Sequence, residues 1–234
     1  MKTLGLIGGT GPESTIEYYR LLTRQYRDKA DGALPHLIIN SVNLTQMIGW
    51  MNANELWKVT DYLVAAFEQL QRAGADFGAL TANTAHIVFD EIEQRCSLPL
   101  ISMVETTCDR AKAHGFKTVA FFGTRYTMQA KFYPSVFSRT DVKLVMPNDQ
   151  EQEFIHDKYF NELLKDIFLP ETRASLLAIA DDMKARHGIE GLILGGTELP
   201  LLLRDEEHNG IRLLDTTRIH VNRLIEELLR SNPI

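Results

Sequence analysis

The sequence of 234 residues is poor in cysteine and has no long hydrophobic run. Its two cysteines, Cys96 and Cys108, are too few for a disulfide framework or a multi-cysteine metal site, and such sparse use fits a reducing cytoplasm. No apolar segment approaches the roughly 18 residues of a membrane-spanning helix. The N-terminal stretch MKTLGLIGGTG has neither the pattern of a signal peptide nor that of a transit peptide. We therefore predict a cytoplasmic protein with no membrane partner.

An excess of basic residues is also absent. The formal net charge is −6, with 31 acidic against 25 basic residues, and the basic residues are scattered along the chain. A protein that binds the phosphate backbone of a nucleic acid would need a basic face. The sequence therefore predicts no nucleic-acid partner and leaves a small molecule as the ligand.

Several well-known catalytic and binding motifs are missing. The seven histidines are dispersed without H-E-x-x-H spacing, which argues against a metal site. There is no G-x-x-x-x-G-K-[ST] segment for a nucleotide and no G-x-S-x-G elbow for a serine hydrolase. The loop Gly9-Thr10-Gly11-Pro12-Glu13-Ser14 lacks the last glycine of a dinucleotide-binding fingerprint.

Short apolar runs alternate with longer amphipathic segments, which predicts an α/β fold. Continuous apolar strands of this kind belong to parallel sheets that are covered on both faces. The spacing of apolar residues predicts helices after the first strand and at 56–70, 154–169, 176–185 and 217–229. It predicts strands at 4–7, 37–39, 77–80, 99–101, 118–122, 143–146, 191–194 and 213–214.

A short internal similarity indicates two related halves. Residues 79–84 precede Pro-Leu-Ile and then Glu-Thr-Thr, whereas residues 193–198 precede Leu-Leu and then Asp-Thr-Thr. Both copies run from a strand through a small polar turn and a helix to a short strand. We therefore predict two similar lobes, each a parallel sheet flanked by helices, related by pseudo-twofold symmetry with the site in the cleft between them. The predicted boundaries are 1–103 plus 213–234 for the first lobe and 104–212 for the second.

Three turns could bind an anionic ligand, because ligands lie at the C-terminal ends of parallel strands. The glycine-rich loop around Thr10 lets backbone N–H groups approach a carboxylate, although it could also be only a tight turn before a helix. Asn83 and Thr84 could hold a carboxylate or could simply cap the next helix. The same two interpretations apply to the turn that contains Thr124 and Thr127.

The motifs GLIGGTGPEST, ANTAH, ISM, GTRYTM, LGGTELPLLL and LLDTT occur in this order and resemble the aspartate/glutamate racemase family. The resemblance extends from the N-terminus to the last helix. It implies two α/β lobes, a homodimer, no cofactor and a small amino-acid or dicarboxylate ligand. The family includes amino-acid racemases, hydantoin racemases, maleate isomerases and arylmalonate decarboxylases.

The resemblance also implies two catalytic cysteines, one in each lobe, that remove and return a proton on opposite faces of the α-carbon. This sequence has Ala82 and Gly196 at the two positions. Neither side chain can carry a proton, so a two-thiol mechanism cannot operate. Cys96 and Cys108 are predicted to be structural thiols.

Other groups must then supply the acid and the base. Glu198 and His86 can titrate near the working pH if their surroundings shift their pKa values, and they form the predicted pair. Thr81 and Thr197, which adjoin Ala82 and Gly196, are also catalytic candidates, although an unassisted hydroxyl is only a weak acid. Glu198 could instead be a structural acid at a helix start.

Two functions from different classes follow. The first is a racemase-family isomerase that acts on a small carboxylate-bearing amino acid through a non-thiol acid–base pair. The second is a non-catalytic amino-acid or dicarboxylate binding protein that kept the pocket and lost the proton carriers. A lyase or decarboxylase with a single base is a weaker third interpretation, because those relatives also use a cysteine.

Overall fold

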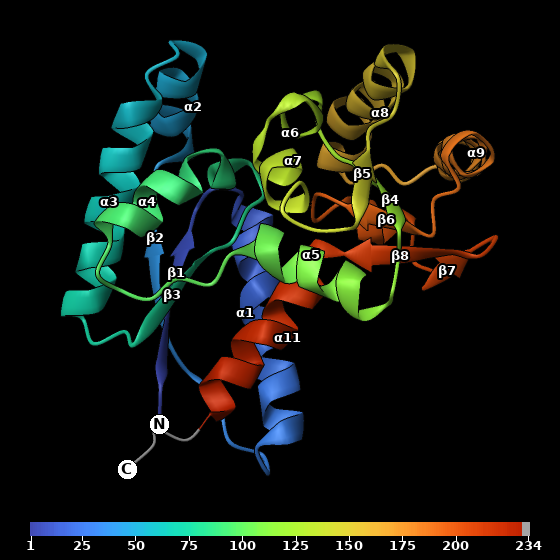
Figure 1. Cartoon of the computed structure of the whole chain (residues 1–234). Helices are drawn as coiled ribbons and strands as arrows, with labels where there is room; N and C mark the ends of the chain where they lie inside the picture. Colours follow the sequence, from blue (N-terminus) through green and yellow to red (C-terminus); the bar gives the residue numbers. More distant parts are fainter. Residues whose placement is uncertain (231–234) are drawn as a thin grey trace. The chain divides into compact units, whose positions relative to one another are not determined.

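The computed structural model describes residues 1–230, and their contacts divide into two compact units. Of the described residues, unit 1 comprises 1–103 and 220–230, and unit 2 comprises Val104–Ile219. Each unit has its own sheet and its own hydrophobic core. Figure 1 labels the helices and strands of both units where there is room.

Unit 1 contains a three-stranded parallel sheet with the order β2-β1-β3. Leu4 of the central strand pairs with Leu37 on one side and with Phe77 on the other. The elements are β1 (Thr3–Gly8), α1 (Pro12–Lys29), β2 (His36–Ser41), α2 (Leu44–Asn52), α3 (Leu56–Arg72), β3 (Phe77–Leu80), η1 (Thr84–Val88), α4 (Phe89–Arg95) and most of α11 (Thr216–Leu229).

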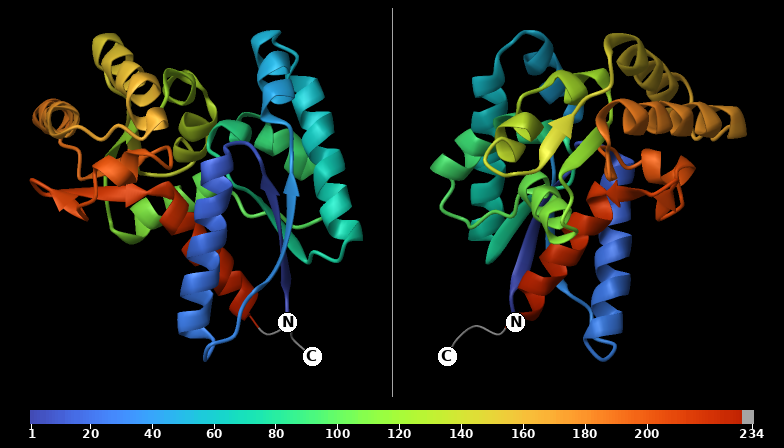
Figure 2. Two further views of the ribbon diagram at one scale, coloured as in Figure 1. Left: turned by 180° about the vertical axis from the view of Figure 1, so that it is seen from behind. Right: turned by 45° about the vertical axis from the view of Figure 1, so that its right-hand side comes forward.

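The side chains of β1 alternate between two cores because successive residues of a strand point to opposite faces. Leu4 and Leu6 pack with Tyr18 of α1 and Leu224 of α11. Ile7 packs on the other face, with the buried side of α3. Helices therefore cover both faces of this sheet, as the two views in Figure 2 show.

Unit 2 contains a five-stranded sheet with the order β5-β4-β6-β8-β7, in which only β7 is antiparallel. Its elements are α5 (Met103–Ala113), β4 (Thr118–Phe122), α6 (Arg125–Gln129), α7 (Phe132–Phe137), β5 (Lys143–Val145), α8 (Asp149–Asn161), η2 (Leu163–Lys165), α9 (Pro170–His187), β6 (Gly191–Leu194), α10 (Leu199–Leu202), β7 (Glu207–His208) and β8 (Ile211–Asp215).

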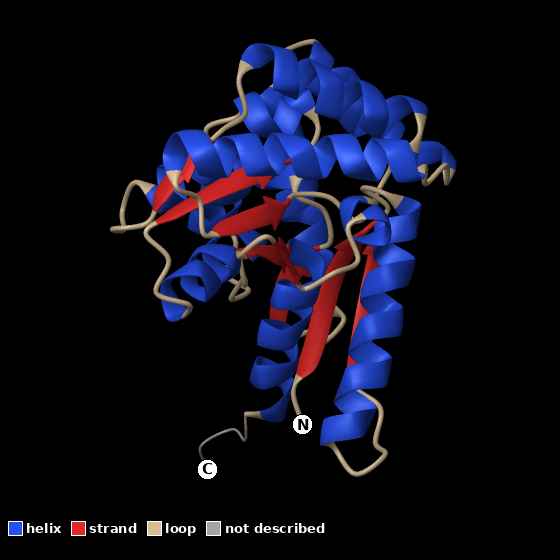
Figure 3. Ribbon diagram, turned by 90° about the vertical axis from the view of Figure 1, so that its right-hand side faces the viewer, coloured by secondary structure: helices blue, strands red, loops and turns tan. Residues whose placement is uncertain are grey.

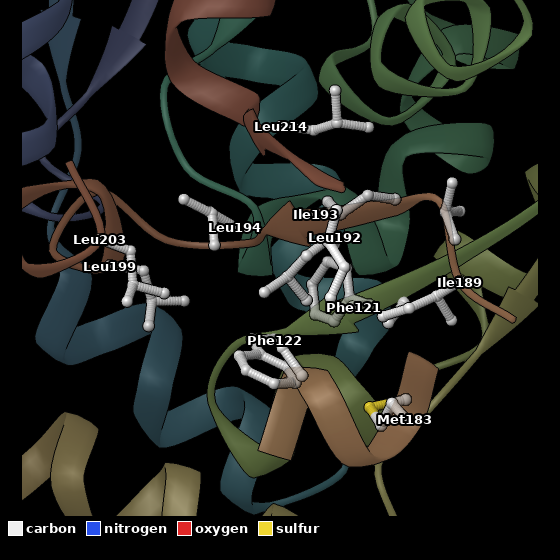
Figure 4. Close-up of a cluster of buried hydrophobic side chains, with 14 of the residues drawn as sticks. Phe121, Phe122, Met183, Ile189, Leu192, Ile193, Leu194, Leu199, Leu203 and Leu214 are labelled. Atoms are coloured by element: carbon white, nitrogen blue, oxygen red, sulfur yellow. The ribbon is translucent and has the colours of Figure 1, made fainter. Parts of the chain in front are cut away.

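The core of unit 2 is built on β4 and β6, all of whose residues except Thr118 are buried. Figure 4 shows Phe121 and Phe122 of β4 in one cluster with Met183 of α9, Leu199 of α10 and Leu214 of β8. Figure 3 shows the strands in red with the helices in blue beside them. The predicted α/β fold with parallel sheets flanked by helices is confirmed.

The predicted strand at residues 99–101 is wrong. The segment forms only an isolated parallel bridge between Leu100 and Gly78. The pairing does not continue beyond this bridge. The Ile101 carbonyl accepts a hydrogen bond from the His220 ring at 3.0 Å and not from a neighbouring strand.

The predicted division of the chain places residues 213–219 in the first lobe, and the structure places them in unit 2. The reason is strand pairing, because β8 lies beside β6, with Leu213 opposite Leu192 and Asp215 opposite Leu194. The chain enters unit 1 again only at His220, inside α11.

Among residues 1–230, no helix combines the length and the apolar character that crossing a membrane requires.

Candidate functional site

The C-terminal ends of β1 and β3 form one edge of the sheet in unit 1. Ile7 lies opposite Leu80 in the register, so the loop that contains Thr10 and the turn after Leu80 leave the sheet side by side. The Thr81 backbone N–H and hydroxyl both donate to the Ile7 carbonyl, at 3.2 and 2.9 Å. The hydroxyl of Thr81 is thus fully buried and fixes the end of the ladder.

The glycine-rich loop after β1 folds closely against the end of β2. Gly9 has a φ of +80°, and a Cβ there would overlap the Val42 carbonyl oxygen, so the position requires glycine. The next residue presents an unusual group. Of the buried side-chain nitrogen and oxygen atoms in the described residues, Thr10 Oγ1 alone has no hydrogen-bond partner. Such a group is costly in a folded protein unless a ligand satisfies it.

The turn after β3 carries Asn83 and Thr84. Asn83 is buried, with 7% of its surface exposed, and precedes the 3₁₀ helix η1 without making a side-chain capping bond to it. The purely structural interpretation, in which Asn83 caps this helix, therefore does not apply. Thr84, half-buried, begins η1.

His86 lies on η1 with both ring nitrogens bonded to the backbone. The Met103 N–H donates to Nε2 at 3.1 Å, so the ring hydrogen is on Nδ1 and is donated to the Ala82 carbonyl at 3.0 Å. Burial lowers the pKa of His86 from 6.5 to about 4, and the ring is therefore neutral. This histidine supports the turn and has no nitrogen left for a substrate proton.

A second buried histidine of unit 1 has the same character. His220 Nε2 donates to the Ile101 carbonyl, and Nδ1 accepts from the Tyr18 hydroxyl at 2.7 Å. Burial and the neighbouring His86 lower the pKa of His220 to about 3. The two histidines thus bind backbone groups of the 100–103 segment, which the sheet leaves unpaired.

In unit 2 the C-terminal ends of β4, β6 and β8 form the corresponding edge. Phe122 lies opposite Leu194, which in turn lies opposite Asp215. The Thr216 hydroxyl donates to the Leu194 carbonyl at 3.0 Å, just as the Thr81 hydroxyl of unit 1 donates to a neighbouring strand. Gly195, Gly196, Thr197 and Glu198 therefore leave the sheet at this edge.

The turn after β4 is a helix cap. Thr124 is the N-cap of α6, and its side-chain oxygen accepts the Thr127 N–H at 3.3 Å. The Thr127 hydroxyl donates to the Thr124 carbonyl at 2.8 Å. The capping interpretation of this turn is confirmed, and Arg125 beside it forms an ion pair with Glu153. Binding of substrate by Thr124 and Thr127 stays a prediction.

Glu198 follows the end of β6 and is half-buried. Its Oε2 atom accepts a hydrogen bond from the hydroxyl of Tyr159 on α8. Burial, together with the negative charge of Glu198, raises the pKa of Tyr159 well above its usual value. The phenol is therefore protonated and the carboxylate is the acceptor. Sequence reasoning identified Glu198 and missed Tyr159.

Metal and thiol chemistry have little support. Within residues 1–230, no group of three or more histidine, cysteine, aspartate or glutamate side chains could hold a metal ion. Cys108 is buried and Cys96 is half-buried, and burial raises the pKa of both thiols. A raised pKa keeps a thiol protonated and unreactive.

A family model described as Asp/Glu/Hydantoin racemase matches residues 7–224. The chain belongs to this family. The match spans the Thr10 loop, the turn after β3 and the segment around Glu198, so it covers the strand edges of both units.

Solved structures and a curated relative agree with the assignment to the racemase family. A candidate Asp/Glu racemase from Yersinia pestis is 30% identical, with a TM-score of 0.93 over 98% of this chain and 100% of that one. An aspartate racemase homologue from Pyrococcus horikoshii OT3 is 32% identical, with a TM-score of 0.87 over the same shares of the two chains. The broad specificity amino-acid racemase RacX of Bacillus subtilis is 28% identical over 157 residues, which cover 64% of this chain and 66% of RacX. These relatives and the family assign this chain to the enzymes of the racemase and isomerase class.

The sequence of this racemase-family protein gives little indication that Tyr159 contacts Glu198. Tyr159 lies in a segment that the apolar spacing predicts as a helix, and its partner Glu198 is 39 residues away. Only the fold, which places α8 against the turn after β6, brings the phenol and the carboxylate together.

Proposed function

We propose that this chain is a racemase or isomerase that changes the configuration at the α-carbon of a small carboxylate-bearing amino acid by means of a non-thiol acid and base. The observation that carries the proposal is the family match across residues 7–224, within which a titratable carboxylate, Glu198, lies at a strand edge. Small-molecule sites of parallel α/β sheets lie at such edges.

Unit 1 supports the part of the proposal that concerns carboxylate binding. The Thr10 hydroxyl is buried without a partner, and Asn83 lies at the same sheet edge without capping η1. A hydroxyl, a side-chain amide and the N–H groups of a glycine-rich loop are suitable donors to a carboxylate. Negative charge that develops during proton removal would be stabilised by the same donors.

Unit 2 supports the part that concerns proton transfer. Glu198 is half-buried and hydrogen-bonded to a protonated phenol, a setting that fixes its orientation. His86 is not included as an acid or base, because both its nitrogens are bonded to the backbone. Thr81 is likewise excluded, since its hydroxyl donates to Ile7.

The absence of a cofactor, a homodimeric state and a cytoplasmic location are parts of the same proposal. They come from the resemblance and from the low cysteine content. Thr84, Thr124, Thr127 and Thr197 remain proposed contacts of the substrate.

The proposal is tested by incubating the protein with a panel of L- and D-amino acids in D₂O. We expect deuterium at the α-carbon, followed by NMR, and the opposite enantiomer, followed by chiral chromatography. Glu198→Gln should lower the exchange rate by about 10²-fold or more, the usual contribution of a general acid or base. Glu93→Gln, the same change at an exposed glutamate of α4, should leave the rate unchanged.

Stabilisation by an amino acid or dicarboxylate without any exchange would overturn the enzyme proposal in favour of a binding protein. A ligand at about 100 times its Kd adds about 2.7 kcal/mol to the free energy of unfolding, which a thermal melt detects.

A further inference from the structure

Gly196 has no side chain, and another residue fills the space that a side chain would occupy. A Cβ atom at Gly196 would overlap the hydroxyl oxygen of Tyr159 and would lie 2.8 Å from its Cζ and 3.0 Å from its Cε2. Tyr159 comes from α8 and is buried, with 5% of its surface exposed. The hydroxyl oxygen of Tyr159 therefore occupies the space that the side chain of a larger residue at position 196 would fill.

The Tyr159 hydroxyl is hydrogen-bonded to a carboxylate that follows the end of β6. Its hydrogen is donated to Glu198 Oε2. A phenol oxygen that donates one hydrogen still has lone pairs with which to accept another. Glu198, the acceptor, is half-buried and so retains contact with solvent, from which it can exchange protons.

We propose that Tyr159 is the catalytic residue of unit 2 and that it exchanges a proton with the substrate α-carbon while passing its own proton to Glu198. This inference rests on the proposed function and names the group that acts at the position of Gly196. In proton removal, the bond between the α-carbon and its hydrogen breaks and a new O–H bond forms at Tyr159. The former phenol hydrogen moves to Glu198 Oε2, and the electron pair stays on the substrate carbon.

The reverse step returns a proton to the carbanion. The Tyr159 O–H bond breaks toward the α-carbon while the carboxyl hydrogen of Glu198 moves to the phenol oxygen. No phenolate accumulates in either direction, because the negative charge lies on the substrate or on Glu198. This agrees with a buried phenol whose ionisation is disfavoured by burial and by the adjacent carboxylate.

The experiment compares two variants that each remove one buried hydroxyl from unit 2. Tyr159→Phe removes the oxygen of the relay, and Tyr133→Phe removes the hydroxyl of a fully buried tyrosine of the core. We expect Tyr159→Phe to lower α-deuterium exchange by about 10²-fold or more and Tyr133→Phe to leave it unchanged. The double variant Tyr159→Phe, Glu198→Gln should be no slower than the slower single variant, because both residues act in one step.

A measurement on the unaltered protein covers the case in which Tyr159→Phe does not fold. The release of tritium from an α-tritiated amino acid is compared in H₂O and in D₂O. In the relay, the phenol hydrogen, which exchanges with solvent, moves in the same step as the α-hydrogen, so the release is slower in D₂O. A base that takes the α-hydrogen without a relay moves no solvent hydrogen in that step and releases tritium equally fast in both solvents.

The outcomes separate this inference from the proposed function. If the unaltered protein exchanges α-protons and a folded Tyr159→Phe does so at the same rate, or if tritium is released equally fast in H₂O and in D₂O, the relay is overturned while the proposed function stands. If the unaltered protein exchanges the α-proton of no amino acid, the proposed function fails and the relay fails with it.

Discussion

The two strand edges carry titratable groups in opposite settings. At the edge of unit 1, both ring nitrogens of His86 are bonded to the backbone, and burial keeps the ring neutral. At the edge of unit 2, Glu198 meets another side chain, the phenol of Tyr159. The difference shows that a place after the C-terminal end of a strand is not enough to make a residue reactive. A group whose hydrogen-bonding capacity is used by the backbone is a structural support, whereas two side chains that share a proton can transfer it.

The hydroxyl groups show the reverse contrast. Thr124 and Thr127 of unit 2 satisfy each other at a helix start. In unit 1, the Thr10 hydroxyl is buried without a partner. An unpaired buried hydroxyl is thus found in the Thr10 loop and not at the start of α6.

The largest expected effect is a fall in the free energy of unfolding as the pH is lowered. The pKa of His86 is lowered by burial from 6.5 to about 4 in the folded protein, and that of His220 is lowered to about 3. As the pH falls below 6.5, the unfolded chain binds protons that the folded chain does not bind, so the free energy of unfolding falls. The loss is complete for His86 only below about pH 4, and it amounts to about 3 kcal/mol for this group alone.

Urea unfolding from about pH 7 down to about pH 4 checks this prediction. His86→Gln should reduce the pH dependence, and His36→Gln, at an exposed position of β2, should leave it unchanged. An equally steep loss of stability in His86→Gln would show that the histidine is not a buried neutral support, and the contrast between the edges would disappear.

A somewhat smaller effect is expected when Gly196 receives a side chain. In Gly196→Ala the new methyl group overlaps the Tyr159 hydroxyl, and we expect a loss of about 1–3 kcal/mol in the free energy of unfolding, typical of overpacking. Adding Tyr159→Phe removes the overlapping oxygen and should recover part of the loss.

The matched control for that variant is Gly49→Ala on α2, where a Cβ meets nothing within 4 Å. It should be neutral, or more stable by about 0.5–1 kcal/mol, because alanine is a better helix former. Chemical unfolding of the three variants decides the matter. Equal stability of Gly196→Ala and Gly49→Ala would contradict the packing of Tyr159 against Gly196.

The smallest expected effect on stability is that of Thr10→Val. Because the hydroxyl has no partner, its removal should leave the free energy of unfolding unchanged or slightly higher. Affinity for an amino acid should fall by about tenfold, as expected for a lost hydrogen bond to a charged group. Calorimetry measures the affinity.

Thr81→Val is the comparison for this change, since the Thr81 hydroxyl donates to the Ile7 carbonyl. Its loss should cost about 1 kcal/mol of stability. If Thr10→Val were the more destabilising of the two, the Thr10 hydroxyl would have a structural role, and unit 1 would lose its proposed ligand donor.

Much of the fold follows from the sequence, because buried parallel strands are continuous apolar runs. The predicted strands at 118–122 and 191–194 are β4 and β6, and the predicted helix at 217–229 is nearly all of α11. The segment at 99–101 misled the prediction, since its apolar residues form a single bridge to Gly78 and no ladder, and none of them is fully buried. Beyond that bridge, the Ile101 carbonyl and the Met103 N–H bond to the side chains of His220 and His86, which no local pattern reveals.

The site is only partly visible in the sequence. The glycine-rich loop and the position of Glu198 after a strand follow from local patterns. The role of His86 does not, because its partners are backbone groups that include Met103, 17 residues away. Tyr159 is hidden for a similar reason, since it becomes informative only when the fold places it against a residue that has no side chain.

The fit between Tyr159 and Gly196 also constrains how such a pair can arise in evolution. A tyrosine at 159 in this position collides with any side chain at 196, even a methyl group. The order of substitutions therefore matters. A side chain at 196 is accepted without overlap only after residue 159 has become smaller, and a tyrosine in this position is accepted without overlap only when residue 196 is glycine.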